Sequence, residues 1–590
     1  MRYPEAQSSN KQRAYTEQFL GLDKRPRTYE GTFAAMGNMT GDPWPLMTSR
    51  KKRGLVTELS KPQGMMALDK LAWVNDGTLY YNGTATAVTG LTAGEKQLVG
   101  MGAYIVIFPD GEYYNTVDST DYGSINRKWQ SSGDVTFSLA DMDGVEYNME
   151  EITVSDTEPE DPEDGDYWIN TGENTHALNK YSEYYERWIG VSSVYVKIGA
   201  TDIGKGLNVQ DGVKVSGIVY TGNDESLKKQ IEFLNAAHVV QAVGDDYIVV
   251  IGLIDQNYTQ TTGTVRADRE APQMDYVIEC NNRLWGCKYG VQDGEFYNIL
   301  YASALGDMKN WQKFMGTAQD SYFVYIGAPG PFTGAASHRG YPYFFKENSV
   351  IKVFGEKPSN FSTQVTLCEG VKPGSSKSLI PYNGALYYLS PVGVQYFESL
   401  PQSIGQALGG PLLEASAAGE CGGKYYLSAK DETGWNLFVF DTERRIWHRQ
   451  DGSRVLAFAE LSGEMYMLLT NGSLYALNGT AGTKEQEDVV WYAETNMMGY
   501  ESPDNKYNGR FVIRAMAGET AVCRISCQWD GDGAWEPLGV IQGDGKVRSH
   551  TFSFIPHRAD SMKLRLEGQG DFALYSIARE VGQGSDSYRR

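Results

Sequence analysis

Asp275–Gly316 reads DYVIECNNRLWGCKYGVQDGEFYNILYASALGDMKNWQKFMG, and this stretch decides the fold. It contains four short apolar or aromatic runs, Tyr276–Cys280, Leu284–Tyr289, Tyr297–Ser303 and Trp311–Phe314. The runs are separated by Asn281-Asn282, by Asp293-Gly294 and by Gly306-Asp307. These turn residues tolerate the positive φ that tight reversals need. The pattern predicts an antiparallel meander of four strands, which serves as the template of a repeating unit.

Hairpins of the same kind recur along the chain. An apolar strand, an Asn/Asp/Pro/Gly turn and an aromatic strand follow one another at 71–83, 104–116, 341–355, 386–397 and 465–477. Additional strands are predicted between them, at Tyr322–Ile326, Tyr425–Ala429, Asn436–Asp441 and Val455–Leu461. The repeat of roughly 40–50 residues is the period of propeller blades. The alternative is an ordinary β-sandwich with many hairpins.

The middle of the chain departs from this pattern. Residues 141–166 contain twelve acids and no base, and the later half of this stretch is rich in proline. Such charge density disfavours a packed core and predicts an exposed, solvated loop. Alternating carboxylates would also suit a calcium ion, although EF-hand spacing is absent. Near the end of this middle region, the pattern of Asn223–Asn235 predicts a helix with Leu227, Ile231 and Leu234 on its apolar face.

The fold class predicted is all-β. It is a β-propeller with an inserted small β-rich module and a C-terminal antiparallel β-sandwich. The predicted parts are an N-terminal arm at 1–53, the first propeller strands at 54–124, the inserted module at 125–235, the rest of the propeller at 236–487 and the sandwich at 488–590. The sandwich rests on clean apolar/polar alternation, as in AVCRISCQW and SMKLRLEG.

The arm differs in charge from the rest of the chain. It carries ten Lys/Arg and five acids, which leaves −26 for the other residues of a chain with a net charge of −21. A basic segment of this kind is commonly a solvated tail. Its end, however, contains large apolar residues that favour burial, and we therefore predict that the arm docks. The candidate docking residues are Trp44, Leu46, Arg50, Lys51, Lys52 and Arg53.

Several classes of protein are disfavoured by the sequence. The longest strongly apolar run, Tyr247–Ile254, is far below the ~18–20 residues of a membrane span, and the first residues lack the apolar core of a signal peptide. The six cysteines and six histidines are dispersed, so neither a disulfide framework, a zinc site nor a cofactor is expected. With 590 residues, the chain is long enough for two to four domains.

The sequence contains no familiar catalytic motif. We find no G-x-S-x-G elbow, phosphate-binding glycine loop or H-E-x-x-H helix. Ser303–Trp311 loosely resembles the Asp-box of sialidase propellers, with the order of Gly and Asp changed. That box stabilises a hairpin and is not a catalytic centre. A pair of carboxylates for glycoside cleavage stays an open alternative, because the distance between the two groups depends on the fold and not on their spacing in sequence. The prediction is that the protein is not an enzyme.

Four stretches carry a resemblance to a known family. They are GTFAAMGNMTGDPWPLMTSRKKRG in the arm, RLWGCKYG…NILYASALGDMKNWQKF, GPFTGAASHRGYPYFFKENSVIKVFG and the ending RADSMKLRLEGQGDFALYSIARE. They resemble proteins of tailed bacteriophages and prophages, and most closely the tail nozzle, or tail tubular protein, of short-tailed phages. The resemblance covers the two ends and the region 272–480, and leaves out the acidic stretch 141–166.

The resemblance implies a structural role in the virion tail. It implies a homo-hexameric ring below the portal and adaptor, in contact with tail fibres or tip, assembled in the cytoplasm of the bacterial host. Genomic DNA would pass through the lumen without specific binding, and the acidic composition predicts an electronegative lumen. The alternatives are a propeller-based receptor-binding or polysaccharide-degrading tail spike, or a distal tail component of a long-tailed phage. A spike would normally be three-fold.

Overall fold

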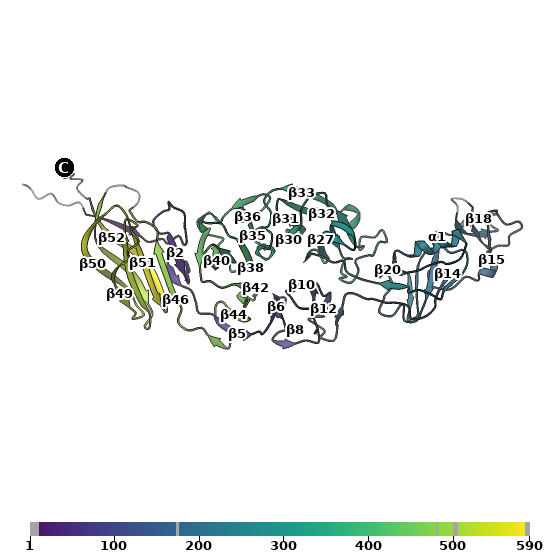
Figure 1. Cartoon of the computed structure of the whole chain (residues 1–590), viewed down its shortest axis with the longest axis horizontal. Helices are drawn as coiled ribbons and strands as arrows, with labels where there is room; N and C mark the ends of the chain where they lie inside the picture. Colours follow the sequence, from purple (N-terminus) through teal and green to yellow (C-terminus); the bar gives the residue numbers. More distant parts are fainter. Residues whose placement is uncertain (1–10, 173–175, 480–481, 500–504, 584–590) are drawn as a thin grey trace, which may run out of the picture.

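The chain forms an elongated, nearly all-β molecule. A computed structural model describes residues 11–172, 176–479, 482–499 and 505–583. Three bodies lie in a row (Figure 1): the sheets that contain β46–β52 at one end, a ring of sheets in the middle, and a body with the helix α1 (Glu225–Leu234) at the other end. Within the described residues, no helix is long and apolar enough to span a membrane.

The middle body is built of repeated four-stranded antiparallel sheets in chain order. Blade 1 has β6 (Pro62–Ala67), β7 (Leu71–Asn75), β8 (Thr78–Tyr81) and β9 (Thr84–Ala85); blade 2 has β10 (Gln97–Met101), β11 (Tyr104–Phe108), β12 (Glu112–Asn115) and β13 (Tyr122–Ser124); blade 3 has β26 (Tyr276–Glu279), β27 (Leu284–Gln292), β28 (Glu295–Ala302) and β29 (Tyr322–Tyr325). Blade 4 has β30 (Phe332–His338), β31 (Tyr341–Lys346), β32 (Ser349–Phe354) and β33 (Ser362–Leu367); blade 5 has β34 (Ile380–Tyr382), β35 (Ala385–Ser390), β36 (Gly393–Phe397) and β37 (Pro401–Ser403); blade 6 has β38 (Glu414–Cys421), β39 (Lys424–Asp431), β40 (Gly434–Asp441) and β41 (Ile446–Arg449).

The seventh blade closes the ring with a strand from the other end of the propeller sequence. It contains β42 (Val455–Leu461), β43 (Glu464–Leu469), β44 (Ser473–Ala476), β5 (Gly54–Glu58) and β45 (Lys484–Glu485). β5 precedes blade 1 in sequence and pairs with β44. The first strands of the blades contact one another in the order β6, β10, β26, β30, β34, β38, β42 and β6 again. The prediction of an all-β propeller is therefore confirmed.

Burial on both faces explains the apolar runs inside the blades. In β31, Phe344 packs toward blade 3, whereas Tyr343 and Phe345 pack toward blade 5. Because each blade lies between two others, consecutive residues of its inner strands are buried, and the strand reads as a continuous apolar run. The predicted positive-φ turns also occur, at Asp76 (φ 48°) and at Asn281 (φ 54°).

Blade 3 differs from its predicted template in its last strand. The outermost strand is β29, and Trp311–Phe314 lies in the loop before it. Side chains hold this loop: Trp311 Nε1 donates to the Met308 carbonyl (3.0 Å), and the backbone N–H of Lys313 donates to Ser321 Oγ (3.2 Å). The aromatic run was predicted as a strand because local pattern does not reveal these hydrogen bonds.

The inserted body contains three sheets. One has β14 (Val135–Ala140), β19 (Tyr195–Gly199), β22 (Ala242–Gly244), β23 (Tyr247–Ile251) and β24 (Tyr258–Gln260); the second has β20 (Gly212–Ser216), β21 (Ala237–Val239) and β25 (Arg266–Asp268); the third has β15 (Ile152–Ser155), β16 (Tyr167–Asn170), β17 (Ala177–Ser182) and β18 (Arg187–Gly190). Strands after residue 235 pair with β14, β19 and β20. The predicted boundary at 235 is thus too early, since β21–β25 belong to the insert.

The predicted helix is present in this body. Asp224 caps α1, because its Oδ1 accepts hydrogen bonds from the backbone N–H groups of Ser226 (2.9 Å) and Leu227 (3.2 Å). Leu227, Ile231 and Leu234 form the buried face of the helix, as predicted.

The insert is fixed to the propeller by a buried amide. Nδ2 of Asn310 donates to Asp211 Oδ1 (2.9 Å), and its Oδ1 accepts from the backbone N–H of Gly212 (2.9 Å). Asp211 is also paired with Arg269. Asn310 is 2% exposed, so water does not replace these bonds.

Replacement of Asn310 by alanine is therefore expected to lower the free energy of unfolding by about 2–4 kcal/mol, because a buried donor and acceptor lose their partner. Urea unfolding followed by tryptophan fluorescence measures the change. Gln319→Ala, an exposed change in the same loop, is the matched control. Equal stability of the two variants would contradict the prediction.

The end body is a sandwich of two sheets. Its strands are β1 (Lys11–Thr16), β2 (Phe33–Gly37), β3 (Met39–Thr40), β4 (Met47–Ser49), β46 (Val490–Thr495), β47 (Lys506–Ala517), β48 (Val522–Trp529), β49 (Glu536–Gln542), β50 (Val547–Ala559), β51 (Met562–Gln569) and β52 (Phe572–Gln583). β1 and β4 pair with β52, and β2 pairs with β46. The segment predicted as a separate N-terminal arm therefore supplies strands to the sandwich.

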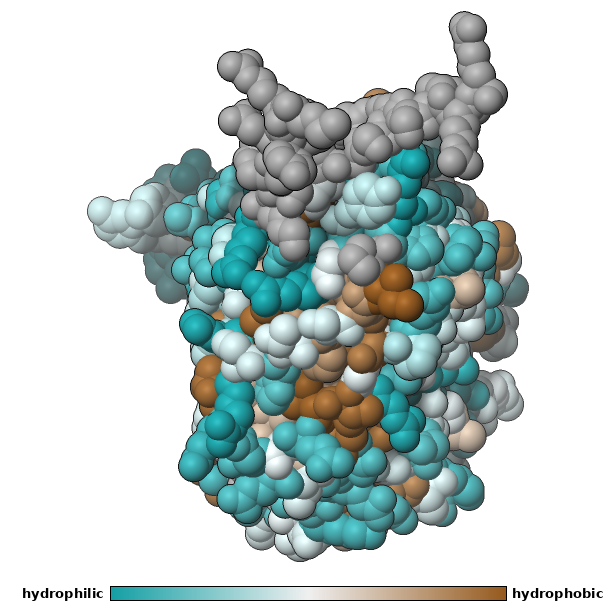
Figure 2. Space-filling model, turned by 90° about the vertical axis from the view of Figure 1, so that its left-hand side faces the viewer, coloured by the Kyte–Doolittle hydropathy of each residue, from teal (hydrophilic) through white to brown (hydrophobic). Residues whose placement is uncertain are grey.

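Apolar side chains also lie on the outside of this body. Figure 2 shows them gathered along the middle of the end face, between polar residues. Exposed apolar residues of these sheets are Tyr15, Val490, Tyr507, Val522, Val540, Val547 and Ile555. An exposed apolar patch surrounded by polar residues is typical of contact surfaces.

Candidate functional site

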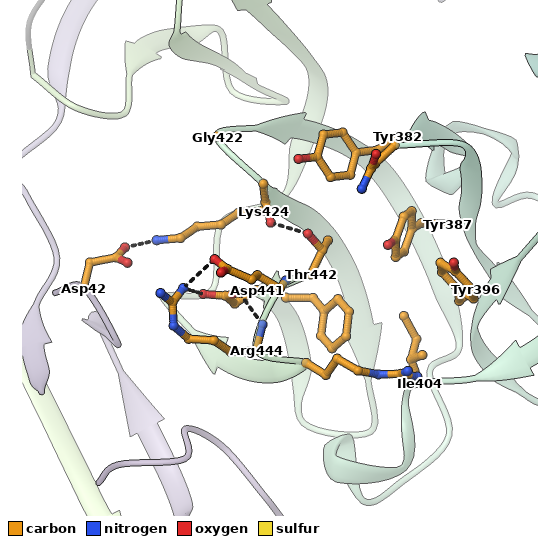
Figure 3. A pocket seen from close by; sticks show the side chains of 15 residues that line it. Asp42, Tyr382, Tyr387, Tyr396, Ile404, Gly422, Lys424, Asp441, Thr442 and Arg444 are labelled. Carbon is orange, nitrogen blue, oxygen red and sulfur yellow. Dashed lines mark hydrogen bonds and ion pairs between the residues drawn. The ribbon is translucent and has the colours of Figure 1, made fainter. Parts of the chain in front are cut away.

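A polar pocket of about 530 Å³ lies where the N-terminal segment meets blades 5 and 6 (Figure 3). Blade 5 contributes three tyrosines, blade 6 contributes the turn between β40 and β41, and Asp42 comes from the loop between β3 and β4. The residues that define the pocket here are Tyr382, Tyr387, Tyr396, Lys424, Asp441, Arg444, Arg445 and Asp42.

Asp441 organises the turn on the blade 6 side. Its Oδ1 accepts the backbone N–H groups of Glu443 (3.1 Å) and Arg444 (2.9 Å), and its Oδ2 accepts Nη1 of Arg444 (2.9 Å). Arg445 then takes a positive φ of 60°. The carboxylate is committed to this turn, which holds the two arginines at the pocket.

Lys424 connects the pocket to the N-terminal segment. Its ammonium group forms an ion pair with Asp42. Burial lowers the pKa of Lys424, the Asp441 charge opposes this shift and the Arg444 charge adds to it. The pair bridges blade 6 and the loop before β4, so it joins two of the three bodies of the molecule.

The other side of the pocket consists of tyrosine side chains. Burial raises the pKa of Tyr387 to about 12, and neighbouring tyrosines add to the shift. The hydrogen bond from Tyr396 to Glu398 raises the pKa of Tyr396. The Arg445 charge lies close enough to lower both values in part. Tyr387 therefore stays a hydrogen-bond donor across the physiological pH range.

This arrangement suits a polar ligand. Tyrosine hydroxyls and a guanidinium group donate hydrogen bonds to hydroxyl or anionic groups. No local pattern in the sequence marks these residues, although the predicted hairpin 386–397 contains two of the tyrosines. The missing signal was tertiary, because blade 5, blade 6 and the N-terminal segment meet only in the fold.

Two of the predicted docking residues are buried inside the chain. Arg53 Nη1 lies 2.8 Å and Arg50 Nη2 lies 3.9 Å from Asp451 Oδ2. Arg50 Nε also donates to Asn38 Oδ1 (2.7 Å). With exposed fractions of 6% for Arg50 and 4% for Arg53, neither side chain is open to an external partner. Their internal role corrects the prediction for these two residues.

The other four predicted docking residues do not form one cluster with this pair. Lys52 Nζ lies 2.8 Å from Asp488 Oδ1, and Lys51 is exposed. Trp44 and Leu46 are half-buried, and the Arg444 guanidinium lies 5.6 Å from the Trp44 ring centroid. Trp44 therefore contacts the pocket turn, and Lys51 is the residue of this set that faces solvent most openly.

One hydrophobic core joins the sandwich to the propeller. It contains Phe19 and Phe33 from the N-terminal segment, Trp447 from blade 6 and Ile577 from β52. The Leu22 backbone N–H also donates to the Trp447 carbonyl (2.6 Å). The two bodies are therefore packed as one unit, and the pocket lies at their joint.

The acidic stretch 141–166 lies in the insert. Oδ1 of Asp141 accepts hydrogen bonds from the backbone N–H groups of Asp143 (3.0 Å) and Val145 (2.9 Å). In the described ranges of the chain, no group of three or more His, Cys, Asp or Glu side chains is placed to hold a metal ion. The described residues therefore offer no site of this kind for the calcium ion considered in the sequence.

The stretch that resembles an Asp-box forms part of the joint between blade 3 and the insert. The backbone N–H of Lys309 donates to Asp307 Oδ1 (2.8 Å), and Asn310 reaches Asp211 of the insert. Ser303 Oγ accepts the backbone N–H of Leu284 (3.0 Å). These bonds are structural, as the resemblance implies.

The chain is similar to known proteins in its three-dimensional structure and not in its sequence. No family model and no curated protein matches the sequence. An exo-β-1,3-galactanase of Phanerochaete chrysosporium is similar at 12% identity and a TM-score of 0.20, covering 52% of this chain and 95% of its own. BamB of Moraxella catarrhalis is similar at 12% identity and a TM-score of 0.31, covering 72% and 97%. The designed protein Ika8 is similar at 10% identity and a TM-score of 0.30, covering 72% and 99%.

The comparison corrects the prediction that the protein is not an enzyme. Glycoside hydrolases are among the similar structures, including an arabinoxylan arabinofuranohydrolase of Bacillus subtilis at 8% identity and a TM-score of 0.18, covering 52% of this chain and 95% of its own. The lack of familiar catalytic motifs in the sequence is not by itself evidence against an enzyme, because catalytic groups are brought together by the fold. At these identities and TM-scores, the likeness assigns no substrate and no catalytic residue.

Proposed function

We propose that the protein is a structural component of a bacteriophage tail, of the nozzle class, in which several copies form a ring around the path of DNA. The sequence resemblance of the two ends and of the propeller region supports this proposal. The observation that carries it is the row of three β bodies in Figure 1, with strands from both ends of the chain in one body and the insert at the far end.

This architecture suits a subunit that stands beside its copies around an axis. Antiparallel pairing of β1 with β52 and of β2 with β46 ties the two chain ends into the sandwich. The shared core and the Asn310 contacts fix the sandwich and the insert to the propeller. Such contacts let the three bodies stand as one elongated unit beside a neighbouring copy.

Ring formation is the test of this proposal. The purified full-length chain is expected to form closed rings in negative-stain electron microscopy, with six-fold symmetry implied by the resemblance. Light scattering after size-exclusion chromatography gives the mass of the assembly. Trimers that release reducing sugars from bacterial polysaccharide would support the spike instead. A monomer at every concentration would contradict the ring.

The charge of the chain gives a second test, on DNA. Proteins that hold DNA neutralise phosphates with Lys and Arg, and a chain with a net charge of −21 supplies little such attraction. The protein is therefore expected to leave the fluorescence anisotropy of a labelled duplex unchanged up to about 10 μM in physiological salt, a concentration at which the tighter non-specific DNA binders, with dissociation constants near 1 μM, are mostly bound. Sub-micromolar binding that weakens steeply with salt would show that basic residues face the duplex.

A further inference from the structure

The pocket between blades 5 and 6 has no part in the proposed tail role. Its volume of about 530 Å³ lies within the range of about 300–1,000 Å³ that is usual for small-ligand sites. Figure 3 shows two different walls: Tyr382, Tyr387 and Tyr396 lie on one side, and Lys424 and Arg444 lie on the other. The chemistry of these two walls decides which ligand the pocket fits.

The tyrosine wall presents two hydroxyl groups to the pocket. Tyr387 is 5% exposed, and among the described residues neither its hydroxyl nor that of Tyr382 forms a hydrogen bond with another side chain or with the backbone. The Tyr387 ring stacks on Tyr425, with 5.5 Å between the ring centroids, so its position is fixed before a ligand enters. Each phenolic hydroxyl can donate and accept, which suits the hydroxyl groups of a ligand.

The charged residues leave one cation for a ligand. Lys424 pairs with Asp42, and Arg444 Nη1 lies 2.9 Å from Asp441 Oδ2, so these charges are balanced within the protein. Arg445 lines the same pocket, and its guanidinium group has no ion pair or hydrogen bond within the described part of the chain. A guanidinium group binds a carboxylate through two parallel hydrogen bonds. The pocket therefore offers one site for a singly charged anion.

Arg445 and the tyrosines face the same space, because the Arg445 charge acts on the hydroxyls of both Tyr387 and Tyr396. We propose that the pocket binds a carboxylate-bearing sugar, with the carboxylate on Arg445 and the sugar hydroxyls on Tyr382 and Tyr387. The tyrosine rings supply apolar surface for the C–H groups of the sugar ring. A phosphate group fits less well, because the carboxylates of the opposite wall repel its second negative charge. This inference goes beyond the proposed tail role and does not depend on ring formation.

Binding of D-glucuronate to the full-length chain tests the inference. A titration followed by saturation-transfer NMR is expected to show saturable binding, with D-glucose and acetate at least ~10-fold weaker because each supplies only part of the contacts. Arg445→Gln is expected to weaken glucuronate binding about 10–100-fold, since it removes hydrogen bonds to a charged group. Tyr387→Phe removes one neutral hydroxyl and is expected to weaken binding about 3–10-fold.

Matched control variants lie in the insert. Arg187→Gln and Tyr184→Phe change exposed residues at the turn between β17 and β18, and both variants are expected to bind glucuronate like the wild type. Circular dichroism checks that all variants keep the wild-type fold. No binding of glucuronate at millimolar concentration, equal binding of acetate or inorganic phosphate, or full binding by Arg445→Gln and Tyr387→Phe would each overturn the inference. Because the assay measures a small ligand, these outcomes leave the test of ring formation unchanged.

Discussion

Replacement of Asp451 by asparagine is expected to lower the free energy of unfolding by about 3 kcal/mol, the low end of the range measured when one partner of a buried ion pair is removed, because the two arginines are buried but the Asp451 side chain is 25% exposed. The carboxylate lies between the guanidinium groups of Arg53 (2.8 Å) and Arg50 (3.9 Å). Burial alone raises the pKa of Asp451, but Arg53, the hydrogen bonds from Ser453 and Arg50 together lower it. Asparagine would leave two buried cations facing each other.

Chemical denaturation of the full-length chain measures this loss. Glu443→Gln is the matched control, because its side chain is 81% exposed and the change likewise removes one negative charge. Replacing Arg50, Arg53 and Asp451 together with methionine, methionine and leucine should recover much of the stability, since apolar residues can replace a buried ionic cluster at little cost. A change below about 0.5 kcal/mol for the single variant, the usual size of surface effects, would show that the cluster contributes little.

The same cluster shows why the docking residues were only partly predictable. SRKKRG reads as a solvated basic run, since nothing within its own window marks two of its arginines for burial. Asp451, which balances Arg50 and Arg53, lies almost 400 residues away in sequence. Local charge patterns predict exposure on average, and a distant partner decides the individual residue.

Strand pairing was only partly predictable for the same reason, because the partner of a strand can lie far away in the sequence. Hairpins were predictable because Asp76 and Asn281 adopt the positive φ that their residue types favour. The apolar run Tyr247–Ile251 was assigned to the propeller, yet β23 pairs with β19 and β22 of the insert. A period-2 or continuous apolar run predicts a strand but does not identify its neighbour. The N-terminal strands, which join a sheet formed some 450 residues later, were missed for this reason.

The second large effect expected is a loss of stability in mild acid, centred on His448. This residue lies on β41, and burial, the dominant cause, lowers its pKa from 6.5 to about 3; the Lys424 charge adds to the shift and Asp441 opposes it. The N-terminal segment covers the ring closely: a Cβ at Gly41 would lie 2.9 Å from His448 Nε2, and one at Gly21 3.3 Å. No group of the described residues forms a hydrogen bond with that Nε2 atom. The joint between propeller and sandwich therefore excludes the charged imidazole.

A lowered histidine pKa means that the unfolded chain binds the proton first. The contribution of His448 is thus fully present above pH 6.5 and is lost progressively as pH falls toward 3, by about 5 kcal/mol in total and about 2 kcal/mol by pH 5. His448→Leu is expected to reduce the loss of stability between pH 7 and pH 5 by about 2 kcal/mol in denaturation experiments, whereas His550→Leu, a change at a half-buried histidine of β50, should keep the wild-type loss. Burial also lowers the pKa values of His238 and His338, and their part of the pH dependence stays in both variants. Because Asp451 has a lowered pKa, its contribution is present above the usual carboxylate pKa of 3.8 and is lost as pH falls below that value, so it does not mask the test between pH 7 and pH 5. Equal pH slopes in wild type and His448→Leu would mean that the imidazole gains a proton without opening the joint.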